Sequence, residues 1–321
     1  MLARHAENLF WAGRYIERAE DTARILDVTY HGLLEASPTE AARAWADVLV
    51  VLRLSSDFGA LSSGIDAVSV SQFLVSDRDN PGSIVSAVPR CRENLRSVRE
   101  LVSTELWESV NRFHLDMRAR NLWADIEAEP YQLYAFVKER CQMVAGAAAE
   151  TMPRDDGWRF LQIGWMLERA EMTCRLLHVR YSGEDPVGFH HWLGTLKSAS
   201  ASEAYRRSYR GSMDPADVLE FLLLSPQFPR SVLFCLRRAE HDLASLGRSP
   251  SAHLSRPERL LGRIRADLEY RDVTEVVADG VPVFLDELQR RVRQVAEAVA
   301  LEYFRNSQEL DLHALESIPA G

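Results

Sequence analysis

The 321-residue chain lacks the residue patterns that mark several common classes of protein. It has only four cysteines and no Cys-x-x-Cys pair, which argues against a disulfide framework or a zinc finger and favours reduced thiols on helices. It has no run of about 18 apolar residues, and its N-terminus lacks the apolar stretch of a signal peptide. We therefore expect a soluble protein that resides in the cytoplasm and does not contact a membrane.

Catalytic and nucleic-acid-binding signatures are missing as well. The 38 Lys and Arg are outnumbered by 47 Asp and Glu, and they form no basic block, which excludes nucleic acid as a main ligand. There is no Gly-x-Ser-x-Gly and no glycine-rich phosphate loop, so the chain alone is not an ATP-dependent ligase. None of the nine His follows an acidic residue by three positions, as helical di-iron sites require. The sequence predicts no cofactor and no metal centre, with only a lone Mg²⁺ left open.

What the chain does contain is a duplicated motif. The segments 13–26 and 164–177 both read Gly-x-x-[Ile/Leu]-Glu-Arg-Ala-Glu-x-Thr-x-Arg-[Ile/Leu]-Leu, and 151 positions separate Glu17 from Glu168. This period is far too long for a solenoid repeat. The sequence predicts an all-α protein made of two tandem-duplicated helical bundles, residues 1–152 and 153–321. We expect the bundles to pack into one compact unit about a pseudo-twofold axis.

The periodicity is helical throughout, without a convincing alternating strand. Residues spaced three and four apart form an apolar seam on the first motif helix: Leu9, Ala12, Ile16, Ala19, Ala23, Leu26 and Tyr30. Charged residues occupy a neighbouring stripe on both motif helices: Glu17, Glu20 and Arg24, then Glu168, Glu171 and Arg175. A further face carries Asn8, Trp11, Tyr15 and Arg18, with Arg169 at the matching place in the second copy. Because the second helix is apolar nearly all round, its charges should be buried and paired.

Two other segments carry candidate binding residues. A third charged helix is expected to begin after Pro89 and to place Arg92, Arg96 and Arg99 on one face. Such a stripe is either a solvated surface or a dock for an acidic partner or phosphate. A later helix, expected to start at Ser200 or Ser202, carries Tyr205 and Arg206.

Taken together, these strings resemble the bacterial alpha-E family, a predicted helical domain with a Glu-Arg motif. The resemblance runs along the whole chain, through segments 8–20, 80–84, 92–100, 167–170, 199–207 and 228–231. It implies association with circularly permuted ATP-grasp ligases, to which alpha-E domains are sometimes fused. Transglutaminase-like and proteasome-like peptidases are further implied neighbours. This context suggests the synthesis or handling of a small peptide or amide, but it supplies no reaction for the domain itself.

Three hypotheses about function remain open. In the first, the chain is an accessory, substrate-handling component of an ATP-grasp amide-ligase system. Its Glu/Arg cluster would bind an amino acid, a peptide or the ligase, since guanidinium groups grip carboxylates and carboxylates bind ammonium groups. In the second, the chain is an enzyme that acts on the peptide product, with Glu17 or Glu168 as general base. In the third, the cluster is a buried ion-pair network of a purely structural interaction protein.

Overall fold

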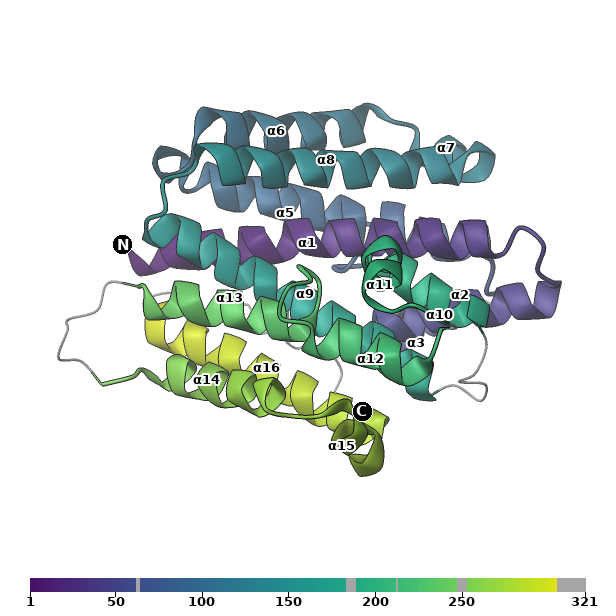
Figure 1. The fold of residues 1–321 in the computed structure, drawn as a ribbon. Coiled ribbons are helices and arrows are strands. Elements are labelled where there is room, and N and C mark those ends of the chain that lie inside the picture. Colours follow the sequence, from purple (N-terminus) through teal and green to yellow (C-terminus); the bar gives the residue numbers. More distant parts are fainter. Residues whose placement is uncertain (62–63, 183–188, 212, 247–252, 305–321) are drawn as a thin grey trace. The chain divides into compact units, whose positions relative to one another are not determined.

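All regular structure in the described part of the chain is helical, which confirms that the protein is all-α (Figure 1). The computed structural model describes residues 1–61, 64–182, 189–211, 213–246 and 253–304. These residues form two compact units, 1–158 and 159–304. The division falls inside a long helix, whereas the boundary expected from the repeat was after residue 152.

The first unit contains five longer helices, with short helices and turns between them. Its elements are α1 (Ala3–Gly32), α2 (Pro38–Val51), α3 (Ser55–Leu61), α4 (Ala67–Ser71), a π-helical turn (Gln72–Ser76), α5 (Ile84–Arg96), a 3₁₀ turn (Arg99–Leu101), α6 (Thr104–Ala119), α7 (Leu122–Ala128) and α8 (Pro130–Thr151). Helix α1 packs against α5 and α8, and α6 packs against the same two helices (Figure 1). The seam of α1 forms the centre of this bundle, with Leu9, Ile16 and Leu26 fully buried.

The third charged helix differs from its prediction. Pro89 does not precede it but lies inside α5, and the helix ends at Arg96. Arg99 belongs to the separate 3₁₀ turn. The cause is local capping: the Ser83 side chain accepts the amide of Ser86, which starts α5 before the proline. A second capping serine, at position 103, starts α6 and ends the irregular stretch.

The second unit begins within the second motif helix. Its elements are α9 (Asp156–Ser182), α10 (Phe189–Ser198), α11 (Ser202–Ser208), α12 (Pro215–Leu224), α13 (Val232–Ala244), α14 (Arg256–Glu269), α15 (Val273–Asp279) and α16 (Val281–Tyr303). The residue before α11 is Ala201, which has no capping side chain. The helix starts at Ser202, one of the two expected positions, and Ser200 turns the chain before it with a φ of 51°.

Helix α14 packs against both α13 and α16 in this unit (Figure 1). Helix α9 contacts α16 at both ends. At one end the rings of Phe160 and Tyr303 meet edge to face at 5.3 Å. At the other, His178 Nδ1 lies 3.2 Å from a carboxylate oxygen of Asp286. These two contacts fix α9 and α16 as antiparallel neighbours.

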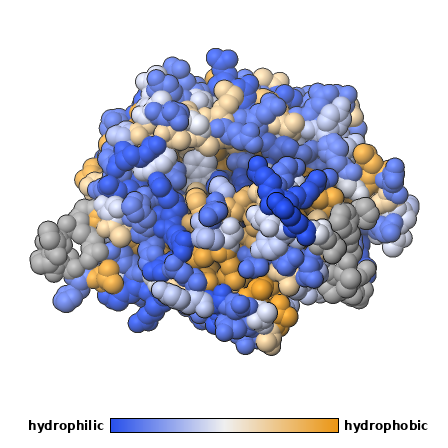
Figure 2. Space-filling view, viewed as in Figure 1, coloured by the Kyte–Doolittle hydropathy of each residue, from blue (hydrophilic) through white to orange (hydrophobic). Residues whose placement is uncertain are grey.

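Some apolar side chains lie at the surface of the second unit near α15 (Figure 2). Val277 of α15 is 48% exposed, and Val283, at the beginning of α16, is 71% exposed. Among the described helices, none is both long enough and apolar enough to cross a membrane.

Candidate functional site

The charged stripe of α1 is buried. Glu17 is 0% exposed, Glu20 4% and Arg24 8%. Arg24 donates a hydrogen bond from Nη2 to the carboxylate of Glu20, one helical turn earlier. Each of these ions has therefore lost most of its hydration, and ion pairing offsets that cost.

A cysteine of α8 shares the environment of these carboxylates. Burial raises the pKa of the Cys141 thiol well above its ordinary value, and the charges of Glu20, Glu17 and Asp21 raise it further. On α5, burial raises the pKa of Cys91 to about 12. Both thiols stay protonated at neutral pH, so neither has the thiolate character of a nucleophile or a metal ligand.

Aromatic and guanidinium groups are stacked along a second face of α1. The rings of Trp11 and Tyr15 stack with centroids 5.8 Å apart. The guanidinium of Arg18 lies 5.8 Å from the Tyr15 ring, and Arg90 of α5 lies at the same distance from it. Asn8 precedes this group and is half-buried. These cation–π contacts tie α5 to α1, so the face carries structural contacts in addition to any binding role.

The motif on α9 has the same internal ion pair. Arg175 Nη2 donates to Glu171 Oε2 at 3.0 Å, and Glu168 is only 1% exposed. The motif arginine Arg169 is half-buried, and its Nη1 donates to the Pro229 carbonyl at 3.4 Å. One side of the α9 motif thus holds the turn that precedes α13.

The three arginines after residue 90 do not form an open basic stripe. Arg92 and Arg96 both donate to the carboxylate of Glu93. The guanidinium groups of Arg92 and Arg99 lie 5.4 and 5.9 Å from the Trp107 ring of α6. The predicted single face is therefore wrong, because the helix ends between Arg96 and Arg99 and local partners engage these side chains.

The candidates on α11 have different surroundings. Tyr205 is buried; its ring stacks on Tyr209 at 4.9 Å and meets the edge of Phe221 on α12. The adjacent Arg206 is exposed. Tyr205 therefore anchors α11 on α12, while Arg206 points into solvent.

Sequence reasoning missed a charged cluster between α13 and α14. Arg265 donates to both oxygens of Glu240, at 2.8 and 3.4 Å, and also to Glu269, which accepts from Arg237 as well. These four side chains and His241 border a hollow of about 440 Å³. The i, i+4 spacing predicts the pair Arg265–Glu269 within α14. The sequence does not predict the contacts of this pair with α13.

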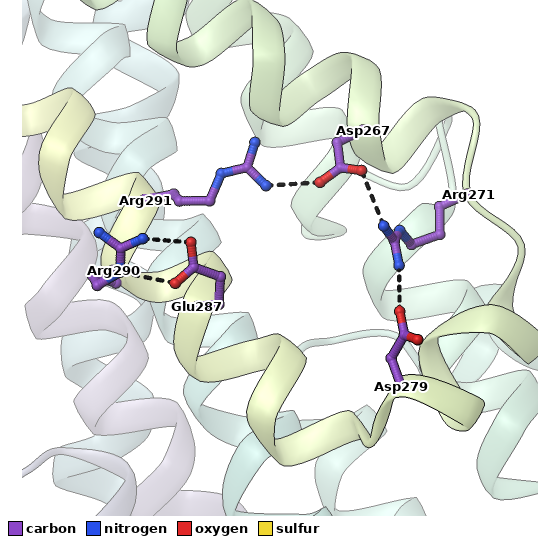
Figure 3. Close-up of polar contacts among 6 residues, drawn as sticks. All are labelled: Asp267, Arg271, Asp279, Glu287, Arg290 and Arg291. Carbon is purple, nitrogen blue, oxygen red and sulfur yellow. Dashed lines mark hydrogen bonds and ion pairs between the residues drawn. The ribbon is translucent and has the colours of Figure 1, made fainter.

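A second chain of ion pairs joins α16, α14 and α15 (Figure 3). Arg291 donates to Asp267 at 2.7 Å, Arg271 donates to the other oxygen of Asp267 at 3.2 Å, and Arg271 also reaches Asp279 at 2.8 Å. These contacts hold the pKa of the Asp267 carboxyl below its ordinary value, although burial acts in the opposite direction. Across the described residues, no three His, Cys, Asp or Glu side chains converge as a metal site would require.

These features define a class: an all-helical protein whose Glu-Arg motif helices, α1 and α9, bury paired charges in two units. The model of the alpha-E family, a predicted alpha-helical domain with a conserved Glu-Arg motif, matches residues 1–304. The chain belongs to the alpha-E family.

The relatives found for this chain are much longer than it is. Uncharacterized proteins from Mycobacterium bovis and from Mycobacterium tuberculosis are each 30% identical to it over 307 residues. The match covers 88% of this chain but only 34% of each relative. No solved structure matches the chain.

Proposed function

We propose that this protein is a cytoplasmic accessory component of an ATP-grasp-type amide-ligase system, in which it handles the ligase's amino-acid or peptide substrate. The proposal rests mainly on the length of the relatives: the region that matches this chain is only about a third of each relative. A domain that recurs inside a longer polypeptide works beside other domains. The alpha-E family resemblance names an ATP-grasp ligase, and secondarily a transglutaminase-like peptidase, as the partner.

The ligand would be bound by the Glu/Arg cluster of one or both motif helices. Support comes from the same buried pair on each helix, Glu20–Arg24 on α1 and Glu171–Arg175 on α9. Guanidinium groups bind carboxylates and carboxylates bind ammonium groups, so both ends of an amino acid have a chemical match. Buried charges also interact more strongly with a ligand than exposed ones.

The two units would be copies of one ancestral bundle. Helices α5 and α13 each contain 13 residues, and each begins after a capping serine, Ser83 or Ser231. Both units end on a long helix that follows a seven-residue one, α7 then α8 and α15 then α16. These shared features support a duplication, and the pseudo-twofold packing stays a prediction.

The proposal is tested by co-purifying the chain with an ATP-grasp-type ligase encoded in the same genome. We expect a complex in gel filtration and a change in the rate of ligase product formation when the chain is added. Absence of both effects with purified proteins would overturn the proposal. Glu275→Gln, at an exposed residue of α15, is the matched control for Glu17→Gln. It should leave both the complex and the change in ligase rate as they are with the wild type.

A purely structural role is the second candidate, favoured by the closed ion pairs within α1 and α9. It predicts that Glu17→Gln and Glu168→Gln each destabilise the fold by about 3–5 kcal/mol, the usual cost of removing one partner of a buried pair. A binding role predicts unchanged or increased stability, because functional charges are commonly kept at the expense of stability. Urea denaturation of the two variants separates these outcomes.

A further inference from the structure

A small groove lies between α14 and α16 in the second unit, and no residue of the α9 motif lines it. It has a volume of about 230 Å³ and is bordered by the charged side chains Arg263, Glu287, Arg290 and Arg291, with Gln294 at one edge. Ile264, on the floor, is 2% exposed. The groove thus combines an apolar floor with a polar, mainly basic rim.

Two of the rim arginines are already held in place (Figure 3). Arg290 binds both oxygens of Glu287, from Nε at 2.8 Å and from Nη2 at 2.5 Å. Arg291 is fixed by the Asp267 carboxylate of α14 at 2.7 Å. Each keeps further N–H donors beyond those used in these bonds. A ligand that binds these two arginines therefore costs little side-chain entropy, because their side chains are already held in place.

The third rim arginine is available. Arg263 is exposed, and no acidic side chain of the described residues lies within ion-pair distance of it. It continues a ridge of exposed arginines on α14, Arg256, Arg259 and Arg263, spaced three and four residues apart and therefore on one face. In a chain with a formal net charge of −9, this ridge is a local concentration of positive charge.

We propose that this groove and the α14 ridge bind an acidic peptide segment, with one glutamate side chain inserted between Arg263 and Arg290. The planar guanidinium forks match a carboxylate, and the apolar floor accommodates the methylene groups behind it. From Arg256 to Arg263 the helix rises by ~10 Å, which about three residues of extended peptide span. Neighbouring carboxylates of the segment then reach Arg259 and Arg256.

This site goes beyond the proposed function, because it lies on other helices and requires no ligase. The first test uses fluorescein-labelled hexaglutamate and measures its anisotropy on titration with the full chain. We expect saturable binding that weakens as salt is raised, since the contacts are exposed ion pairs. Hexalysine should not bind. Absence of hexaglutamate binding at low salt would overturn this inference while leaving ligase binding intact.

The second test locates the site. Arg263→Glu should weaken hexaglutamate binding by at least about tenfold, because it sets a like charge against the ligand. Arg207→Glu, the same change at an exposed residue of α11, is the control and should have little effect. Equal losses of hexaglutamate affinity in both variants would mean that the peptide responds to the overall charge of the protein, and would overturn the assignment of the site to this groove. Unlabelled hexaglutamate and inorganic phosphate are then compared as competitors of the labelled peptide. If phosphate displaces the labelled peptide at the same concentration as unlabelled hexaglutamate does, the groove is a phosphate site and the proposal is overturned. Circular dichroism verifies that both exposed substitutions leave the helices folded.

Discussion

Arg175 of α9 donates a hydrogen bond from Nη2 to Oε2 of Glu171, one helical turn earlier, at 3.0 Å. The pair is buried: Glu171 is 2% exposed and Arg175 8%. Charged i, i+4 pairs on a helix surface contribute only a few tenths of a kcal/mol. A buried pair is different, because the remaining charge has no water to replace a missing partner.

Glu171→Gln should therefore destabilise the protein by about 3–5 kcal/mol, since it leaves the Arg175 guanidinium buried without a carboxylate. Urea denaturation followed by circular dichroism measures the loss. The control is Glu287→Gln, which removes the carboxylate from the Arg290 pair, whose side chains are about half exposed. That variant should unfold almost like the wild type, because solvent screens the pair. Equal stability losses in the two variants would contradict the assigned burial.

The helices of the motif were readable from the sequence because their packing pattern is local. Leu9, Ile16 and Leu26 follow the three-four spacing, and all three are fully buried. The error at Pro89 also has a local cause. The sequence prediction starts the helix after Pro89, whereas the capping serine at position 83 is the stronger signal and places the proline within α5.

The candidate charges were only partly predictable. The Glu20–Arg24 and Glu171–Arg175 pairs follow from helical spacing alone. The bond between Lys138 and Asp27 joins residues 111 positions apart and depends on how α8 is placed along α1. Periodicity identifies the buried face of a helix but not its axial position against a neighbour. For this reason the α13–α14 cluster and the α14–α16 groove became visible only in the structure.

Two helical glycines give opposite predictions for substitution by alanine. Gly146, on an exposed face of α8, has open space where a Cβ would be placed. Gly146→Ala should stabilise the protein by about 0.5–1 kcal/mol, because alanine loses less backbone entropy in a helix. At Gly262 of α14 the added Cβ would lie 3.1 Å from Oε1 of Glu240, the partner of Arg265. Gly262→Ala should therefore stabilise the protein less than Gly146→Ala does, since the Glu240–Arg265 ion pair must shift to make room for the methyl group. Thermal denaturation of both variants tests this, and a larger gain at Gly262 would contradict it.

All four cysteines should be unreactive in the native protein. Cys91, Cys141, Cys174 and Cys235 are buried, and burial raises the pKa of Cys91 to about 12. At pH 8 a thiol reagent such as Ellman's should find no accessible thiolate until the chain is denatured, when all four react. Leu115→Cys, at a position 49% exposed, is the positive control and should react at once. Rapid reaction of a native thiol would show that the helices around it open readily.

The buried phenol of Tyr134 should make stability fall at alkaline pH. Its hydroxyl is paired with Ser71 Oγ at 2.6 Å, and burial raises its pKa from 10.0 to about 12. The neutral phenol is favoured in the folded state, so its contribution is constant below pH 10 and is lost as pH rises from 10 towards 12. Over that interval the loss is about 2–3 kcal/mol.

Tyr134→Phe separates this effect from other alkaline titrations. At pH 7 the variant should lose about 1 kcal/mol with the hydrogen bond to Ser71. Between pH 10 and 12 its stability should then fall less steeply than that of the wild type, because no buried phenol remains at this position to resist ionisation. Tyr270→Phe, at a side chain 86% exposed, should follow the wild-type curve. Urea denaturation at a series of pH values measures the slopes. Parallel curves for Tyr134→Phe and the wild type would mean that the Tyr134 phenol is not protected from ionisation, and would contradict its burial between α8 and α4.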